Sequence, residues 1–186
     1  MKRALPWLLG AALALSAGVI SVSTPGDEVY RTPFLIRGVS EEHPVTSRTL
    51  TAMALEASFT DRVTVADAEW HSDGNWLVVT VAASAPMTEV DARIQLATLV
   101  IGDRVFQSSE RPGNSLAEAE LRVGIDTVGM LAFELPPDVK TGDGELRLTT
   151  SFATPVLDDV IVLPISLDDL PRTRNIDLAA PELRPS

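Results

Sequence analysis

The chain has 186 residues, of which 45% are hydrophobic and 22% charged, a balance typical of globular proteins rather than disordered ones. Its formal net charge is −11, and without Lys2 and Arg3 the remainder has 13 basic and 26 acidic residues, or −13. Such a surface does not attract phosphates or anionic lipid headgroups, so we expect no nucleic-acid partner. The absence of cysteine excludes disulfides, thiolate metal sites, a cysteine nucleophile and a lipid-modified cysteine.

Residues 1–24 are predicted to be an export or anchor segment that precedes the fold. Lys2 and Arg3 are followed by an uncharged, mostly apolar run over residues 4–22, close to the roughly 20 residues that a membrane-spanning helix needs. We favour an uncleaved anchor. A cleaved signal peptide is the alternative, because small residues occur at the two positions that a signal peptidase reads. In both cases the basic pair stays inside and the rest lies outside the cytoplasm.

Residues 25–33 are predicted to be a linker, and a folded domain is expected over residues 34–167. The domain begins with a strand at residues 34–39, which a turn follows. Residues 48–59 alternate in sequence between two faces and contain threonines, which favours a strand. One turn of amphipathic helix is the alternative, because the segment also contains good helix formers.

The clearest strand pattern lies at residues 75–83, after an Asp73-Gly74 pair that predicts a hairpin turn over residues 72–75. Side chains of a strand alternate between its two faces. One face is continuously apolar, and the other begins apolar and becomes small or polar. We therefore predict a central strand that is fully buried on the first face, with Trp76 as a core residue on the other. The first face consists of Leu77, Val79, Val81 and Ala83.

A second hairpin is predicted from residues 92–101 and 104–108, which Gly102-Asp103 connects. Residues 107–120 are the longest polar stretch and are expected to be a surface loop, where a variable contact surface is favoured. An exposed sheet face and the acidic C-terminal segment are the alternatives for that surface. Further strands are predicted at residues 130–135, 145–152 and 160–166, the last with Pro164 at a sheet edge. Residues 168–186, which contain three prolines, are predicted to be an extended C-terminal tail.

Short strands separated by turn signals at intervals of about ten residues predict an all-β fold. No long helix is expected outside the N-terminal segment. The fold class that we predict is an immunoglobulin-like β-sandwich preceded by one N-terminal transmembrane or signal helix.

Four short motifs carry a family resemblance. In chain order they are Thr32-Pro33-Phe34 with Gly38, residues 73–79 (DGNWLVV), residues 102–106 (GDRVF) with Ser108, and residues 129–136 (GMLAFELP). Together they resemble the telokin-like, immunoglobulin-like domains of exported bacterial proteins, a group of unknown function common in actinobacteria. The resemblance covers about residues 32–152 and implies a sandwich outside the membrane, without transferable catalytic residues. Many such proteins are lipoproteins, so here a peptide anchor would replace the lipid.

The candidate ligand residues are few. His43 and His71 are the only histidines, and both adjoin predicted turns, so we expect exposed turn residues and no metal site. Asp158-Asp159 and Asp168-Asp169 do not follow a recognised calcium-loop spacing. Residues 170–174 (LPRTR) resemble a cell-wall sorting signal in four positions but have Arg in place of Gly at the fifth.

No nucleophile elbow, Ser-x-x-Lys, phosphate-binding loop or His-Glu-x-x-His motif occurs in the sequence. We therefore assign no catalytic, cofactor-binding or metal-ligating residue. The expected function is that of a non-enzymatic, membrane-anchored extracytoplasmic module that makes contacts with another protein. The alternatives are a soluble secreted or ligand-binding accessory domain after signal cleavage, and a hydrolase built from loop carboxylates.

Overall fold

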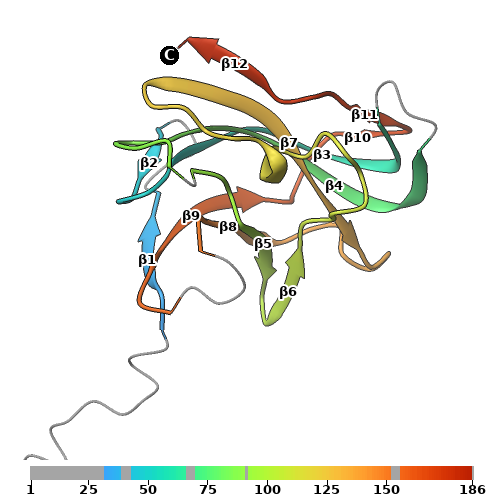
Figure 1. Ribbon diagram of the computed structural model, residues 1–186. Helices are drawn as coiled ribbons and strands as arrows, with labels where there is room; N and C mark the ends of the chain where they lie inside the picture. Colours follow the sequence, from blue (N-terminus) through green and yellow to red (C-terminus); the bar gives the residue numbers. More distant parts are fainter. Residues whose placement is uncertain (1–31, 39–42, 66–69, 91, 152–155, 186) are drawn as a thin grey trace, which may run out of the picture. The chain divides into compact units, whose positions relative to one another are not determined.

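Two β-sheets make up the fold in a computed structural model that describes residues 32–38, 43–65, 70–90, 92–151 and 156–185 (Figure 1). Residues 33–186 form one compact unit. Apart from the short 3₁₀ helix η2 (Leu116–Glu118), the regular structure of the described residues is all β-strand. The predicted anchor at residues 1–24 lies outside them. Within the described part of the chain, no helix is long and apolar enough to cross a bilayer.

The predicted all-β fold is confirmed, with the strands arranged as a sandwich. The first sheet has five strands in the order β1 (Phe34–Arg37), β9 (Asp159–Ser166), β8 (Asp143–Thr149), β5 (Leu96–Ile101) and β6 (Arg104–Gln107). The second sheet has the order β10 (Arg172–Thr173), β3 (Thr51–Val65), β4 (His71–Ser84), β7 (Ile125–Leu135) and β12 (Glu182–Pro185). Two further short strands, β2 (Val45–Thr46) and β11 (Ile176–Leu178), also pair with β3.

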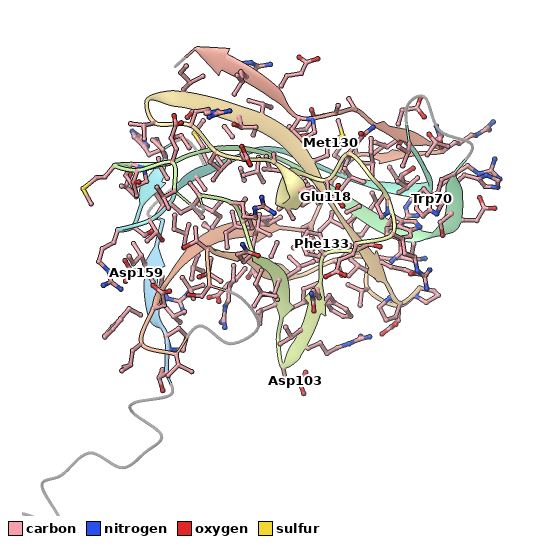
Figure 2. All side chains as sticks on the ribbon, in the orientation of Figure 1. Trp70, Asp103, Glu118, Met130, Phe133 and Asp159 are labelled. Carbon is pink, nitrogen blue, oxygen red and sulfur yellow. The ribbon has the colours of Figure 1, made fainter. Side chains whose placement is uncertain are left out.

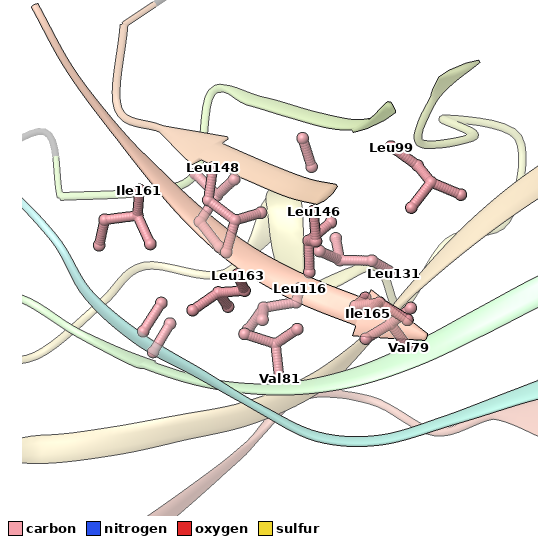
Figure 3. Close-up of a cluster of buried hydrophobic side chains, with 14 of the residues drawn as sticks. Val79, Val81, Leu99, Leu116, Leu131, Leu146, Leu148, Ile161, Leu163 and Ile165 are labelled. Carbon is pink, nitrogen blue, oxygen red and sulfur yellow. The ribbon is translucent and has the colours of Figure 1, made fainter. Parts of the chain in front are cut away.

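The main core lies between the two sheets, and β4 is its central strand. The predicted inner face of β4 is confirmed, because all four of its residues are at most 1% exposed and belong to the main core. The five-stranded sheet faces them with leucines and isoleucines of β5, β8 and β9 (Figure 3). These residues are Leu99, Leu146, Leu148, Ile161, Leu163 and Ile165.

The ambiguous segment at residues 48–59 belongs mainly to a strand, β3, as predicted, but its alternation is broken once. The register with β4 moves from Ala54↔Val81 to Glu56↔Thr80, so Leu55 is an extra residue in a β-bulge. As a result, Ala54 and Ala57 both pack against the main core, and Glu56 is exposed. Uninterrupted alternation from Ala52 and Ala54 would have directed the Glu56 carboxylate inward.

The hairpin turn predicted at Asp73-Gly74 is wrong. Both residues lie within β4, where the pairing moves from Thr60↔Trp76 to Arg62↔Asp73 and leaves one extra residue on β4. The ladder continues beyond this bulge, and the Arg62 guanidinium donates to Asp73 Oδ1 at 2.6 Å. Glycine suits the bulge here because a Cβ at Gly74 would lie 3.1 Å from Trp76 Nε1.

The hairpin predicted at Gly102-Asp103 is confirmed. It joins β5 to β6, with Asp103 at its tip (Figure 2). Gly102 has a φ of 60°, which glycine adopts without steric cost and which a two-residue hairpin with glycine first requires.

A C-terminal tail was predicted at residues 168–186, but the described part of this segment, residues 168–185, is built into the seven-stranded sheet. Strands β10 and β11 run parallel to β3, and β12 pairs antiparallel with β7 at the opposite edge (Figure 1). Leu178 on β11 is 1% exposed and packs in a second apolar cluster around Trp76. The pairing of sheet edges and the burial of Leu178 hold this segment in place.

The surface loop predicted at residues 107–120 is only partly exposed. Ser115 caps η2, and its Oγ accepts a hydrogen bond from Ala117 N–H at 3.3 Å. Leu116, the first residue of η2, is fully buried in the main core. Ala117 and Ala119 also pack against this core, so the contact surface favoured on the loop is smaller than its length suggests.

Replacing Gly129 with alanine is expected to lower the free energy of unfolding by about 1–3 kcal/mol. An added Cβ would lie 3.1 Å from Leu116 Cβ and 3.2 Å from Pro181 Cβ, which are held by η2 and the C-terminal segment. Urea denaturation measures the change. In the control Gly113→Ala the new Cβ has no heavy atom within 4 Å, so its unfolding midpoint should stay unchanged or rise slightly. Equal behaviour of the two variants would contradict this packing.

Candidate functional site

A lateral cleft of about 550 Å³ opens between the two sheets where β3 faces β9. On this side of the sandwich the chain passes from the five-stranded to the seven-stranded sheet twice, between β1 and β2 and between β9 and β10. The residues lining the cleft come from β3, from the second half of β9 and from the connection to β10. They are Met53, Ala54, Leu55, Glu56, Ala57, Pro164, Ile165, Ser166, Asp168 and Leu170.

One wall of the cleft is a strand edge without a neighbour. On the outer edge of β3, β2 pairs with Thr51 and Ala52, and β10 begins opposite Phe59. Among the described residues, no strand pairs with this edge between these two points. Phe59 N–H points outward and donates to Pro171 O at 2.9 Å. Because alternate residues of an antiparallel ladder direct their backbone groups to the same side, Ala57 presents its N–H and C=O to the cleft.

The opposite wall is the second half of β9. Pairing with β1 ends at Val162, so Pro164 lies beyond the reach of β1 although β9 is an inner strand of its sheet. Pro164 is exposed and has no N–H to donate. Pro164 was predicted at a sheet edge, and it does lie where β9 has no neighbour on the β1 side, although β9 as a whole is an inner strand. The open backbone donors of the cleft therefore lie on β3.

The lining combines an apolar floor with an acidic rim. Ala54, Ala57, Ile165 and Leu170 belong to the main core or pack against it, and the first two have small side chains that leave room above them. Glu56 and Asp168 stand at the rim, and the lining residues include no Lys or Arg. Asp168 is held in position because its Oδ1 accepts a hydrogen bond from Gly142 N–H at 3.0 Å. The cleft therefore suits an apolar ligand that carries positive charge.

The sequence did not predict this cleft. Its residues were assigned to separate strands and to the beginning of the tail. A contact surface was expected on residues 107–120, on an exposed sheet face or on the acidic tail, and only Asp168 and Leu170 of the cleft come from that tail. One signal was present: Glu56 follows Ala52 and Ala54 on the same strand face, which conflicts with a buried face and indicates a bulge.

The Asp158-Asp159 pair considered for calcium is bound to a cation of the protein itself. Asp159 lies at the start of β9 and is 7% exposed (Figure 2). Its Oδ2 accepts hydrogen bonds from Arg48 N–H and from Arg48 Nε, both at 3.0 Å. Asp158 accepts from the Ser151 hydroxyl and, at 3.4 Å, from the Arg48 guanidinium. The pair therefore links the strand β9 to the segment before β3.

The Arg48–Asp159 contact predicts a loss of stability in acid. The hydrogen bond from the Arg48 side chain is the main cause that holds the pKa of Asp159 below its usual value, although burial opposes it. A pKa lowered in the folded state adds stability above the unfolded value of about 3.9, and this contribution disappears as the pH falls through the folded pKa. Asp159→Asn should therefore unfold at lower urea concentration than the parent at pH 7, with a smaller difference at roughly pH 2.5.

The control for this pH dependence is Asp103→Asn at the exposed tip of the β5–β6 hairpin. This substitution should leave the urea midpoint unchanged at pH 7 and at the acidic pH. A difference between Asp159→Asn and the parent that is equally large at both pH values would show that the carboxylate charge is not what stabilises the contact.

The remaining sequence candidates lie apart. His43 precedes β2 and is exposed, and His71 is the exposed first residue of β4, opposite Thr64. In the described part of the chain, no group of three or more His, Cys, Asp or Glu side chains could hold a metal ion. Within residues 170–174, Leu170 lines the cleft, and Arg172 donates to Asp61 and Asn75, both at 2.6 Å. The sorting-like sequence is thus folded into the sheet edge.

Comparisons with known proteins give fold resemblances only. No protein-family model and no curated protein matches the chain. Among solved structures, a provisionally assigned lipoprotein from Staphylococcus aureus is similar over 74% of this chain and 96% of its own, with 12% identity and a TM-score of 0.47. An uncharacterised β-sandwich protein from Clostridium difficile is similar over 73% and 96%, with 11% identity and a TM-score of 0.45. The function of the chain is therefore argued from its own residues.

Proposed function

We propose that the protein is a non-enzymatic, immunoglobulin-like module of the telokin-like type, held outside the cytoplasmic membrane by residues 1–24, and that it makes contacts with a protein partner. The lateral cleft carries the proposal of a protein contact, because it combines an open strand edge with an apolar floor. The proposed location rests on the basic pair Lys2-Arg3 and the apolar run at residues 4–22.

A protein partner suits this cleft better than a small metabolite. Small-molecule sites are mainly concave pockets that enclose most of the ligand and place a few polar side chains around it. Here the polar groups that lack a neighbouring strand include the backbone N–H and C=O of Ala57, on the open edge of β3 between β2 and β10. Backbone groups on an open strand edge are satisfied by another polypeptide.

The test is fractionation of cells that produce the full chain with a C-terminal affinity tag, followed by cross-linking and extraction in a mild detergent. We expect the protein in the membrane fraction and one reproducible cross-linked partner. The control replaces the apolar run with a signal peptide that is known to be cleaved, which should release the domain from the membrane. Recovery of the intact chain as a solitary monomer without a cross-linked partner would contradict the proposal.

A second candidate is a soluble secreted or ligand-binding accessory domain. It is favoured by the small residues at Ala14 and Ser16, or at Ser21 and Ser23, which match the positions that a signal peptidase reads. Mapping of the mature N-terminus decides between the two candidates. A terminus at Ala17 or Thr24 in culture medium would select the secreted form and exclude the anchor.

A further inference from the structure

We propose that the cleft binds an extended segment of the partner as an added strand on the free edge of β3, with a basic side chain of that segment beside Glu56 and Asp168. This inference deepens the proposed function and rests on it. It specifies the site, the mode of binding and the chemical class of the ligand.

The first step is the backbone geometry. The chain itself uses the same edge of β3 twice, with Val45↔Ala52 of β2 on one side of the gap and Arg172↔Phe59 of β10 on the other. Between them, Ala57 directs its N–H and C=O outward. At about 3.3 Å per residue the gap accepts a segment of roughly five or six residues, enough for a short ladder. Strand addition to an open sheet edge is a common mode of peptide recognition.

The second step is the space for side chains. In an added strand, alternate side chains point toward the floor of the cleft. The floor offers the small side chains Ala54 and Ala57 beside the larger Leu170. A cleft of about 550 Å³ holds one or two apolar side chains of the bound segment.

The third step is charge. Glu56 and Asp168 are the only charged residues of the lining, and the whole chain has a formal net charge of −11. A lysine or arginine of the bound segment would complement the two carboxylates. The same charges disfavour a second copy of this chain as the occupant, because antiparallel pairing of two β3 edges would bring two Glu56 carboxylates close together. The partner segment is therefore a basic, partly apolar peptide from another protein.

The test uses the purified full chain in detergent micelles and a phage-displayed library of random nine-residue peptides. We expect enrichment of peptides with alternating apolar residues and at least one Lys or Arg. Each amide of an enriched peptide is then methylated in turn. Affinity should fall at least tenfold at alternate positions within the five or six residues that occupy the gap, because a ladder uses alternate N–H groups. This readout needs no variant of the protein.

Two sets of variants locate the site. Ala57→Pro removes the outward N–H and should weaken binding at least tenfold, with thermal unfolding as the check of folding. Glu56→Gln combined with Asp168→Asn should weaken binding about fivefold or more and reduce its dependence on salt. The matched control is Asp103→Asn combined with Glu182→Gln, two exposed carboxylates outside the cleft lining, and its affinity should equal that of the parent.

Three results would overturn the inference: no enriched peptide, enriched peptides whose methylation shows no alternation, or binding that survives the cleft variants. A dimer in sedimentation velocity that Ala57→Pro dissociates would identify a second copy as the occupant and would overturn it too. None of these results contradicts the proposed function, because a partner cross-linked in membranes can contact another face of the domain. Conversely, peptide binding without any partner or membrane association would refute the proposed function and leave the cleft as a peptide site.

Discussion

Replacing Trp76 with alanine is expected to lower the free energy of unfolding by about 3–5 kcal/mol. The indole is fully buried on the outer face of β4, where it packs with Val63, Val78 and Leu178. Its removal would leave a cavity between the sheet and the C-terminal segment, and packed neighbours on both sides limit collapse into that cavity. Urea denaturation at pH 7, followed by far-ultraviolet circular dichroism, measures the change.

Two further variants make this prediction specific to the indole ring. Trp76→Phe keeps a large aromatic side chain and removes Nε1, which is buried without a hydrogen-bond partner among the described residues. It should therefore lower the free energy of unfolding clearly less than Trp76→Ala does. Trp70→Ala changes a tryptophan that is only partly buried at the border of the same cluster, and should also cost less. A midpoint of Trp76→Ala equal to that of the parent would show that this cluster does not stabilise the fold.

The sequence predicted those parts of the fold that local patterns determine. The alternation in residues 75–83 identified both faces of β4 correctly, because a side-chain period of two is visible within a single strand. Gly102-Asp103 was correctly assigned as a hairpin turn because residues on both sides of it alternate and pair with one another. In each case the pattern that carries the prediction lies within one short stretch of the sequence, even where its side chains pack against distant strands.

Asp73-Gly74 shows where local patterns fail. The same two residues suit a tight turn and a β-bulge, since both use the conformational freedom of glycine. The choice between them depends on the pairing of Arg62 with Asp73 and of Thr64 with His71, which extends β3 and β4 beyond the bulge. These contacts are formed by the other strand, so residues 72–75 alone carry no sign of them.

The candidate site was hidden for a related reason. The cleft exists because the strands on the outer edge of β3 stop at Ala52 and resume at Phe59, and because β1 ends opposite Val162. A gap between pairings leaves no composition signal in the sequence. Only Glu56 gave a sign of the cleft in the sequence, because it falls on the apolar face of the strand pattern and thereby indicates the bulge that turns its carboxylate outward.

The C-terminal segment was predicted as a tail because its strands are too short to show a period. Strands β10, β11 and β12 contain two, three and four residues, fewer than alternation needs to be recognised. The three prolines of the segment also favoured the prediction of a solvated tail. The partners of these strands, on β3 and β7, lie far away in the sequence and supply the order that the segment itself does not specify.

Leu178→Ala tests this corrected assignment and is expected to cost about 2–5 kcal/mol in the free energy of unfolding. Leu178 is 1% exposed, lies opposite Val65 of β3 and belongs to the same apolar cluster as Trp76. Its carbonyl also accepts a hydrogen bond from Asn114 Nδ2 at 3.2 Å, which ties the segment to the loop before η2. Urea denaturation of the full chain measures the loss.

The matched control is Leu183→Ala, the same substitution five residues later on β12. Leu183 is 58% exposed, so its loss should stay within about 0.5 kcal/mol. The contrast between the two leucines separates burial from any general effect of changing the C-terminal segment. If this segment were a solvated tail, neither substitution would change the free energy of unfolding. Such a result would contradict the packing of Leu178 in the cluster around Trp76 and would support the tail predicted at residues 168–186.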